Sequence, residues 1–576
     1  MPGFQDTTAL QTLRTVAISG VLTLILGLIA LLFPNIANNF FHPVEQSFSR
    51  FAERKTLAII VLFFSVIVLR LAALPLLPVP VPGIHDEFSY LLMADTFAHG
   101  RLANPPHPMW VSFETFHVNW FPKYASMYPP AQGVALALGQ ILGHPWIGVL
   151  LSDAAMCAVI LWMLQGWMPA RWAFLGGVLA ALKFGVASYW MNSYWGGATA
   201  AIGGALVLGA LPRIVKRANI RDAVLLGLGV AILANSRPYE GFLFCIPAAA
   251  WFFWWLIGKT KSQQPLRVRL QNVLAPLALV LVLTAAFMGY YNWRLTRNPL
   301  LLPHTLNVRT YHTAPMFIWQ HAKPPRQYNN AQFEDFYNGW ERENYDNTWA
   351  DVWRVSAEKL GRCAITYFWV GELLALPAIP FHFRDRKMRL LFAAFLLVTV
   401  GVFAVIWSNA HYAAPLTCVI FALAVQAIRR LRTMRIGVRS AGVALSRAIV
   451  LLLVLDTGIN TFRGICDPLL WPCQGDPSRT AIAEKLQHTP GKHLIMVRYD
   501  KDSSNHNIHD EWVYNGAEID TAKILWAREL DPQQNAKLLA YFRDRKIWLV
   551  TPDSDNTYLE PYTPPGSPTE VDSNDK

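Results

Sequence analysis

Twelve apolar runs, each close to the length of a membrane-spanning helix, dominate the chain. A bilayer core of about 30 Å takes roughly 20 helical residues to cross. The runs lie near 15–34, 57–77, 145–167, 171–190, 197–214, 223–236, 239–257, 272–293, 363–381, 390–407, 412–428 and 443–460. Because a span must satisfy its own backbone hydrogen bonds inside lipid, the pattern predicts an all-α polytopic membrane protein with about twelve transmembrane helices.

Composition agrees with this prediction and excludes several other classes. Hydrophobic residues make up 53% of the 576 residues and charged residues 15%, whereas soluble domains are about 25% charged. Six cysteines without a CxxC pair exclude a disulfide scaffold and give no sign of structural zinc. The net charge of +12 is carried by Lys and Arg in short loops between apolar runs, so we exclude a nucleic-acid partner.

The basic loops fix the predicted orientation of the chain. Clusters of Lys and Arg occur within 50–55, 213–221, 259–269, 384–389 and 429–439. Twelve crossings put all of them on one side, which the positive-inside rule makes cytoplasmic. The long segments 83–130, 294–360 and 461–576 then face outward. In a bacterium this is the periplasmic side of the inner membrane, and we expect the active site and the C-terminal domain there.

These features predict four parts of the chain. Residues 1–56 form an N-terminal helix and cytoplasmic loop, and residues 57–460 form the transmembrane domain with its external loops. Residues 461–560 form a small periplasmic α/β domain, with strands at 493–497 and 547–550 and a helix at 532–543. Residues 561–576 have little to bury and are expected to be disordered. A disulfide between Cys466 and Cys473 is expected in that oxidising compartment.

An acidic pair follows the second apolar run, in the sequence His85-Asp86-Glu87-Phe88. Phe88, Leu91 and Leu92 recur at helical spacing and predict a helix over 87–98 at the outer interface. Asp86 then lies near the helix N-terminus, where the dipole favours an anion. Two interpretations are open. Asp86 either caps the helix, with Glu87 in the first turn, or serves as a general base at the boundary between lipid and water.

Three short motifs, in this order, resemble the GT-C glycosyltransferase superfamily, and in particular the branch of family 39 protein O-mannosyltransferases and lipid A aminoarabinose transferases. The resemblance covers about residues 57–430. The first motif is the Asp-Glu pair with its short helix and the closing Tyr128-Pro129-Pro130; the others are Arg237-Pro238-Tyr239-Glu240 and His411-Tyr412 with Pro415. The chain departs from the family at two places: Tyr128 stands where many relatives have His, and His411 stands where Arg is usual.

The resemblance implies a GT-C-like fold and an inverting transfer of a sugar from a polyprenyl-phosphate donor to a lipid, glycan or protein acceptor at the periplasmic face. By this resemblance Asp86 is the catalytic base and Glu87 supports it. Arg237 is the first candidate for binding the donor phosphate, with Lys183 and His411 as further candidates. Weaker cationic candidates in the loop 294–360 are Arg294, Arg297, His304, Arg309 and His312.

No metal site is assigned from the sequence. His85, His99 and His107 are near the acidic pair, but their irregular spacing does not match a ligand set. Relatives in the superfamily differ in metal dependence, so a divalent metal remains compatible with this reading. We find no phosphate-binding glycine loop, which excludes a transporter with its own ATPase.

Two other functions compete with the transferase. A polytopic transporter or flippase of a lipid-linked or small-molecule substrate also has many spans and intramembrane charges. The long outward loops, the interfacial acidic pair and the lack of an evident inverted repeat count against it. A catalytically inactive relative that uses its C-terminal domain as a binding module is the other alternative.

Overall fold

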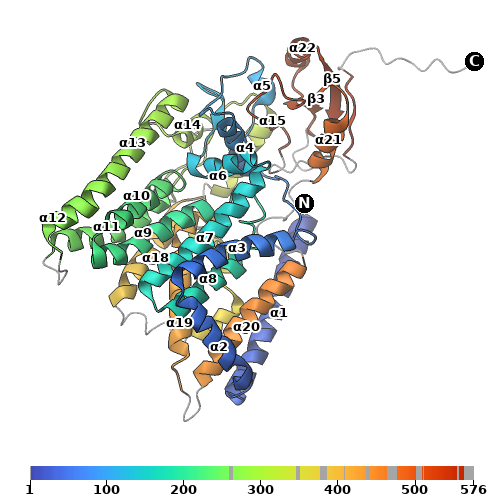
Figure 1. The fold of residues 1–576 in the computed structure, drawn as a ribbon. Helices are drawn as coiled ribbons and strands as arrows, with labels where there is room; N and C mark the ends of the chain where they lie inside the picture. The colour runs from blue at the N-terminus through green and yellow to red at the C-terminus, as the bar shows by residue number, and fades with distance from the viewer. Residues whose placement is uncertain are drawn as a thin grey trace, which may run out of the picture.

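The computed structural model describes residues 2–258, 264–345, 351–376, 386–407, 409–435, 441–463, 477–500, 509, 511–553 and 557–563. It is mostly helical, with a small mixed sheet near the C-terminus. The helices form one bundle, and the sheet lies at the end of that bundle where α4 and α5 also lie (Figure 1). Cys466 and Cys473 are outside the described residues, so the disulfide stays a prediction.

Seven helical stretches in the described part of the chain are long and apolar enough to cross a membrane. Two shorter apolar stretches lie in α1 (Pro2–Leu32) and α18 (Arg386–Ala404). The protein is therefore a multi-pass membrane protein, while the number of twelve spans remains a prediction. The seven are α3 (Lys55–Ala72), α7 (Pro145–Trp167), α9 (Ala198–Arg217), α11 (Pro238–Ile257), the run of α12 (Leu266–Arg269), η1 (Leu270–Leu274) and α13 (Ala275–Thr296), η4 (Ala410–Leu416) with α19 (Thr417–Leu431), and α20 (Ala441–Phe462).

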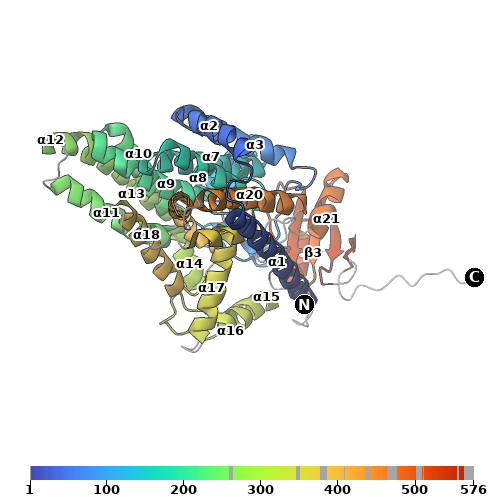
Figure 2. The same cartoon turned by 90° about the horizontal axis from the view of Figure 1, so that it is seen from below.

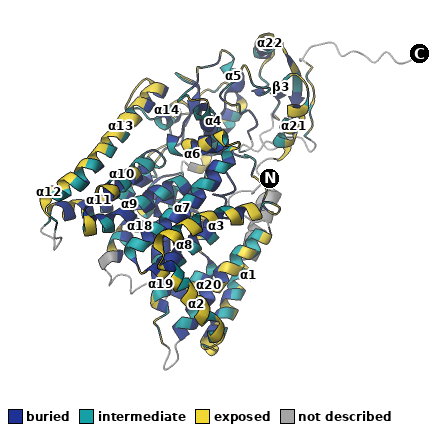
Figure 3. Ribbon diagram, viewed as in Figure 1, coloured by how far each residue is buried: buried dark blue, intermediate teal, exposed yellow. Residues whose placement is uncertain are grey.

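The helices differ in how much of their apolar surface the protein itself covers. In α7 72% of the apolar window is buried, and in the stretch from η4 through α19 the share is 83%. The corresponding share is 22% in α3 and only 11% in the run that ends in α13, and both helices show long exposed faces (Figure 3). Exposed Leu279, Val282 and Leu283 on α13 are apolar. These faces are suited to contact lipid.

Small residues let the central helices approach closely. Helix α9 packs against α10 (Ile220–Ala234) through Gly203 and Gly229. A Cβ atom at Gly203 would lie 3.0 Å from the Gly229 carbonyl oxygen, and one at Gly229 would lie 2.8 Å from the Gly203 oxygen. Membrane helices, which gain little from hydrophobic burial against lipid, commonly pack in this way.

Two helices end earlier than their apolar runs predicted. Helix α8 (Ala170–Phe184) stops six residues short of the predicted end at 190, and residues 185–197 are irregular. There Asn192 donates two side-chain hydrogen bonds of 2.8 Å to the carbonyls of Val186 and Ser188, so a side chain satisfies backbone that a helix would otherwise pair. Helix α17 (Asp351–Tyr367) likewise ends inside the predicted run 363–381.

The end of the bundle near the sheet is built from short elements. Helix α4 (His85–Ala98) matches the predicted interfacial helix and begins two residues earlier. The other short elements there are α5 (Trp110–Phe113), β1 (Val118–Asn119), β2 (Ala125–Ser126), α6 (Pro130–Ile141), α14 (Pro303–Thr310), α15 (Ala331–Phe333), η2 (Glu334–Trp340) and α16 (Glu341–Tyr345). Seen from below, α14 to α17 gather on one side of the bundle (Figure 2). At the opposite end, α2 (Asn38–Ala52) packs beside α19 and α20 (Figure 1).

The C-terminal part is a four-stranded sheet with the strand order β4-β3-β5-β6. Strands β3 (Lys492–Val497), β4 (Ile524–Arg528) and β5 (Arg545–Val550) are parallel, and β6 (Glu560–Pro561) joins β5 antiparallel. Helices α21 (Pro477–His488) and α22 (Pro532–Tyr541) complete it. The two predicted strands and the predicted helix are confirmed. The predicted disordered tail lies mostly outside the described residues, from 564 onward.

Candidate active site

Helix α4 presents Asp86 from its first turn. The helix begins after Ile84, whose extended backbone makes it the N-cap residue without a side-chain cap. The interpretation of Asp86 as the N-cap is therefore wrong, because Asp86 is the second residue of the helix, two positions after the N-cap. Its carboxylate accepts a hydrogen bond from the Tyr128 hydroxyl, and Nδ1 of His117 lies 3.9 Å from it. Its side chain is 22% exposed, so a substrate group can reach it.

His117 is the neighbour of Asp86 that the sequence analysis missed. It has a backbone φ of 59°, a left-handed conformation uncommon outside glycine. Its carbonyl accepts hydrogen bonds from the Ser89 hydroxyl at 2.7 Å and from the Met127 amide at 3.0 Å, which hold the backbone there. Its Nδ1 lies 3.1 Å from the Tyr128 hydroxyl oxygen. Burial lowers the pKa of His117, so the ring is neutral near pH 7.

Glu87 is buried and holds the site together from behind. The Gly83 amide donates to one carboxylate oxygen at 2.8 Å and the Tyr194 amide to the other at 2.9 Å. Burial raises the pKa of Glu87 to about 7. Both carboxylate oxygens accept hydrogen bonds, and Glu87 is only 5% exposed. Through the bond from Tyr194, Glu87 ties α4 to the irregular segment 185–197. This geometry agrees with a supporting role.

Arg237 lies at the start of α11, where Pro238 is the first helical residue. Its guanidinium carbon is 4.2 Å from the centre of the Tyr412 ring. A guanidinium keeps its charge in proteins and has a planar set of donors suited to phosphate. It is half-buried, so it can still meet a ligand.

Three tyrosines contact Asp86, Arg237 or one another, and we call Tyr90, Tyr128 and Tyr412 the tyrosine trio. The rings of Tyr90 and Tyr128 stack at 4.4 Å. The Tyr128 hydroxyl donates to Asp86, and the Arg237 guanidinium lies over the Tyr412 ring. Within the described residues, no ion pair joins Asp86 to Arg237.

The structure places the other two predicted phosphate ligands differently. His411 is buried next to Tyr412, with its Nδ1 3.1 Å from the Tyr189 hydroxyl and its ring 4.5 Å from that of Trp195. It lies close enough to Arg237 to interact electrostatically. Lys183 donates hydrogen bonds of 3.0 Å to the carbonyls of Ile365 and Phe368 at the end of α17. There it satisfies helix-terminal carbonyls, as basic side chains commonly do.

Further histidines lie in the same external loops and in the C-terminal part of the chain. His85 stacks on Phe116 at 4.3 Å, and Nδ1 of His312 is hydrogen-bonded to the buried carboxylate of Glu341 at 2.5 Å. Burial lowers the pKa of His304 and of His509 to about 4, so both rings are neutral near pH 7. His509 comes from the C-terminal part of the chain, and no local pattern indicated it. Among the described residues, no three His, Cys, Asp or Glu side chains are arranged to hold a metal ion.

Comparisons with known proteins concern the fold. No protein-family model and no curated protein sequence matches the chain. ArnT from Cupriavidus metallidurans in the apo state matches with 14% identity over 86% of this chain and 93% of that one, at a TM-score of 0.46. The Archaeoglobus fulgidus oligosaccharyltransferase in its apo form matches with 11% identity over 77% and 62%, at 0.42. The arabinofuranosyltransferase AftD from Mycobacteria matches with 15% identity over 86% and 35%, at 0.42.

All three likenesses have TM-scores below 0.5 and identities of 15% or less, so the reaction is inferred from the side chains at the site.

Proposed function

We propose that the protein is an inverting membrane glycosyltransferase that moves a sugar from a polyprenyl-phosphate donor to an acceptor hydroxyl on a lipid, glycan or protein. The observation that carries this proposal is that Asp86 and Arg237 each contact a tyrosine of the trio, while no ion pair joins them within the described residues. Transfer of a phosphate-activated sugar needs a base for the acceptor and a cation for the leaving phosphate. Asp86 and Arg237 are proposed to supply them.

Asp86 takes the acceptor proton in this proposal. As the hydroxyl oxygen forms a bond to the anomeric carbon, the proton moves to the carboxylate and the bond from that carbon to the phosphate oxygen breaks. The Tyr128 hydroxyl orients Asp86 through its hydrogen bond, and His117 lies beside both groups. A correctly placed general base contributes about 10²–10⁴-fold to a rate.

Arg237 holds the phosphate as charge develops on it. Stacking on Tyr412 keeps the guanidinium in place. Its donors are proposed to bind phosphate oxygens, which a guanidinium binds in a bidentate manner. His411 lies next to Tyr412 in the sequence, in the segment η4 that leads into α19. The Lys183 ammonium donates to two carbonyls at the end of α17. It is proposed to bind the phosphate only when it gives up these hydrogen bonds.

The proposed location is the outer leaflet of a bacterial inner membrane, with the site and the C-terminal domain in the periplasm. Its support is the distribution of Lys and Arg, which puts the loop of Asp86 opposite the basic loops. Lipid-facing helices such as α13 provide the apolar surface that a polyprenyl chain needs.

Mass spectrometry of cell-envelope glycans, lipids and glycoproteins, with and without the protein, tests the proposal. We expect one sugar modification to disappear without the protein and to stay absent when only the Asp86→Ala variant is supplied. A transporter or flippase would work normally with that variant. Normal modification by Asp86→Ala would therefore refute the transferase, and an unchanged envelope in cells without the protein would do so too.

A further inference from the structure

The C-terminal domain does not stand apart from the external loop that contains Asp86. The two share one hydrophobic core in the described structure. Buried residues of the loop 83–130 meet buried residues of the sheet and its helices, and none of those listed here is more than 7% exposed: Leu92, Phe113, Val118 and Tyr124 from the loop, and Leu494, Met496, Ala517 and Leu538 from the domain. A shared core of this kind resembles a domain interior more than a transient interface.

One segment of the domain, residues 511–520, lies along α4 and the chain that follows it. The Tyr514 ring stacks on Phe88 at 4.4 Å, two residues after Asp86. The Ala517 amide then donates to Asp95 at 2.6 Å, and Glu518 pairs with Arg101 at 2.5 Å. Both chains advance in the same order, so the 511–520 segment contacts the helix from its first turn to beyond its last.

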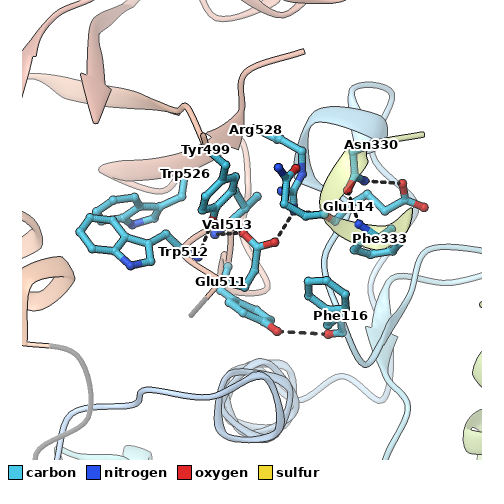
Figure 4. A network of polar contacts seen from close by, with 12 residues as sticks. Glu114, Phe116, Asn330, Phe333, Tyr499, Glu511, Trp512, Val513, Trp526 and Arg528 are labelled. Carbon is cyan, nitrogen blue, oxygen red and sulfur yellow. Dashed lines mark hydrogen bonds and ion pairs between the residues drawn. The ribbon is translucent and has the colours of Figure 1, made fainter. Parts of the chain in front are cut away.

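The same segment is fixed within its own domain by a buried ion pair. Glu511 pairs with Arg528 of β4, and their side chains are 2% and 1% exposed. Arg528 also lies beside Glu114 (Figure 4) and donates to its carbonyl at 3.3 Å. A further hydrogen bond of 2.8 Å joins Arg528 to Gln332. Glu114 in turn accepts hydrogen bonds from Asn329 and Asn330. The network therefore joins the domain to both external loops, 83–130 and 294–360.

A second cation clamps Phe88 from the domain side. The Arg479 guanidinium carbon is 4.7 Å from the Phe88 ring centre and 4.5 Å from that of Trp526. Arg479 also donates to the carbonyls of Trp512 and Tyr514 at 3.0 Å each. Phe88 is thus held by Tyr514 and Arg479 together, two residues after the residue proposed as the base.

We infer that the C-terminal domain positions Asp86 for the transfer reaction. Tyr514 does this by holding Phe88, and with it the first turn of α4, in place. The inference rests on the proposed function, because it takes Asp86 to be the base of that reaction. Tyr514 is a positioning residue and does not itself touch the reacting atoms. The rate should depend on it, since small displacements of catalytic groups have large effects on rate.

The test compares Tyr514→Ala with Tyr514→Phe in the full-length protein in detergent. Hydrogen exchange by mass spectrometry is followed in peptides covering 84–98, with α9 and β3 as internal references. For Tyr514→Ala we expect about tenfold faster exchange in the first turns of α4, because the ring contact is lost. For Tyr514→Phe we expect exchange at the wild-type rate, because the ring is kept. Asp95→Ala removes a contact from the α4 side, leaves the sheet intact, and should loosen residues 92–98.

Two further readouts separate this inference from the proposed function. Binding of undecaprenyl phosphate should be unchanged in Tyr514→Ala, while the envelope modification should fall about tenfold or more and be retained by Tyr514→Phe. Exchange of α4 at wild-type rates in both Tyr514→Ala and Asp95→Ala would overturn the inference, and so would faster exchange with full modification. If the wild type modifies nothing, the proposed function fails, and the exchange data still decide whether the domain holds α4.

Discussion

Two charged clusters at opposite ends of the bundle use the same residue types in different ways. Near α2, the Glu45 carboxylate pairs with Arg432 of the α19 end at 2.8 Å and with Arg447 of α20 at 2.9 Å. Although burial alone would raise it, these two hydrogen-bonded cations lower the pKa of Glu45 to about 2. Both cations are bonded to the one carboxylate, so this cluster links three helices through ion pairs made within the protein.

At the other end, Asp86 and Arg237 are kept apart. Asp86 accepts a hydrogen bond from Tyr128, the Arg237 guanidinium stacks on Tyr412, and no ion pair joins these two charges within the described residues. Charged groups arranged in this way are more often found at functional sites than in structural ion pairs. On the proposed function, the difference between the two clusters is one between a structural ion pair and a site that binds a substrate.

The largest effect that separates the two clusters is expected from carboxylate replacement. Asp86→Asn removes the proton acceptor and keeps the shape, so turnover should fall about 10²–10⁴-fold while folding is unchanged. Glu45→Gln is the matched control: its thermal stability should fall, with envelope modification per folded molecule unaltered. The two readouts are modification by mass spectrometry and thermal unfolding. Equal loss of activity in both variants would remove the distinction.

The arginines of the two clusters should differ in the same way, Arg237 in ligand binding and Arg432 in stability. Arg237→Ala should weaken binding of undecaprenyl phosphate about tenfold or more, because a charge-assisted bidentate contact is lost. Arg432→Ala should leave that binding unchanged and lower the melting temperature. Binding is measured on purified protein by isothermal calorimetry. A normal affinity in Arg237→Ala would move the phosphate site elsewhere.

The buried pair of the C-terminal domain gives a third contrast, because both of its ends are nearly inaccessible. Arg528→Met leaves Glu511 unpaired and should destabilise the domain by about 3–5 kcal/mol. Glu511→Gln combined with Arg528→Met removes both charges and should recover much of that loss. The resistance of the C-terminal domain to proteolysis, measured in the full-length protein, reports its stability. If the double variant is no more resistant than Arg528→Met alone, the two residues are not energetically coupled.

Glu87 adds a pH dependence to these effects. Burial raises its pKa to about 7 from an unfolded value of 4.5. Between those values the folded protein holds a proton that the unfolded chain has lost, so stability should fall as pH rises from about 5 to 7 and then level off. The shift corresponds to about 3 kcal/mol. Thermal unfolding of wild type and Glu87→Gln across this range is the measurement, and parallel curves would contradict it.

The sequence predicted what local patterns determine. Helical spacing located α4, and the strands at β3 and β5 followed from their apolar character. The motif around Arg237 indicated a residue that the structure does bring to the tyrosine trio. These features depend on residues close together in the chain, and local propensity is enough to find them.

Other features depend on contacts between distant segments. His117 reaches Asp86 through a left-handed backbone that no residue pattern announced. The early end of α8 depends on Asn192 and on Arg70, which donates to it at 2.8 Å across 122 positions. The 511–520 segment contacts α4 from more than 400 residues away. No periodicity encodes such pairings, because they are set by tertiary packing.

The central contrast is open to a direct measurement of access. Asp86→Cys and Glu45→Cys are each introduced into a version of the chain without its native cysteines, and intact spheroplasts are treated with a membrane-impermeant thiol reagent. The account predicts labelling at position 86 from outside, slowed by undecaprenyl phosphate, and no labelling at position 45 until the membrane is opened. Labelling of position 86 only after the membrane is opened would contradict it.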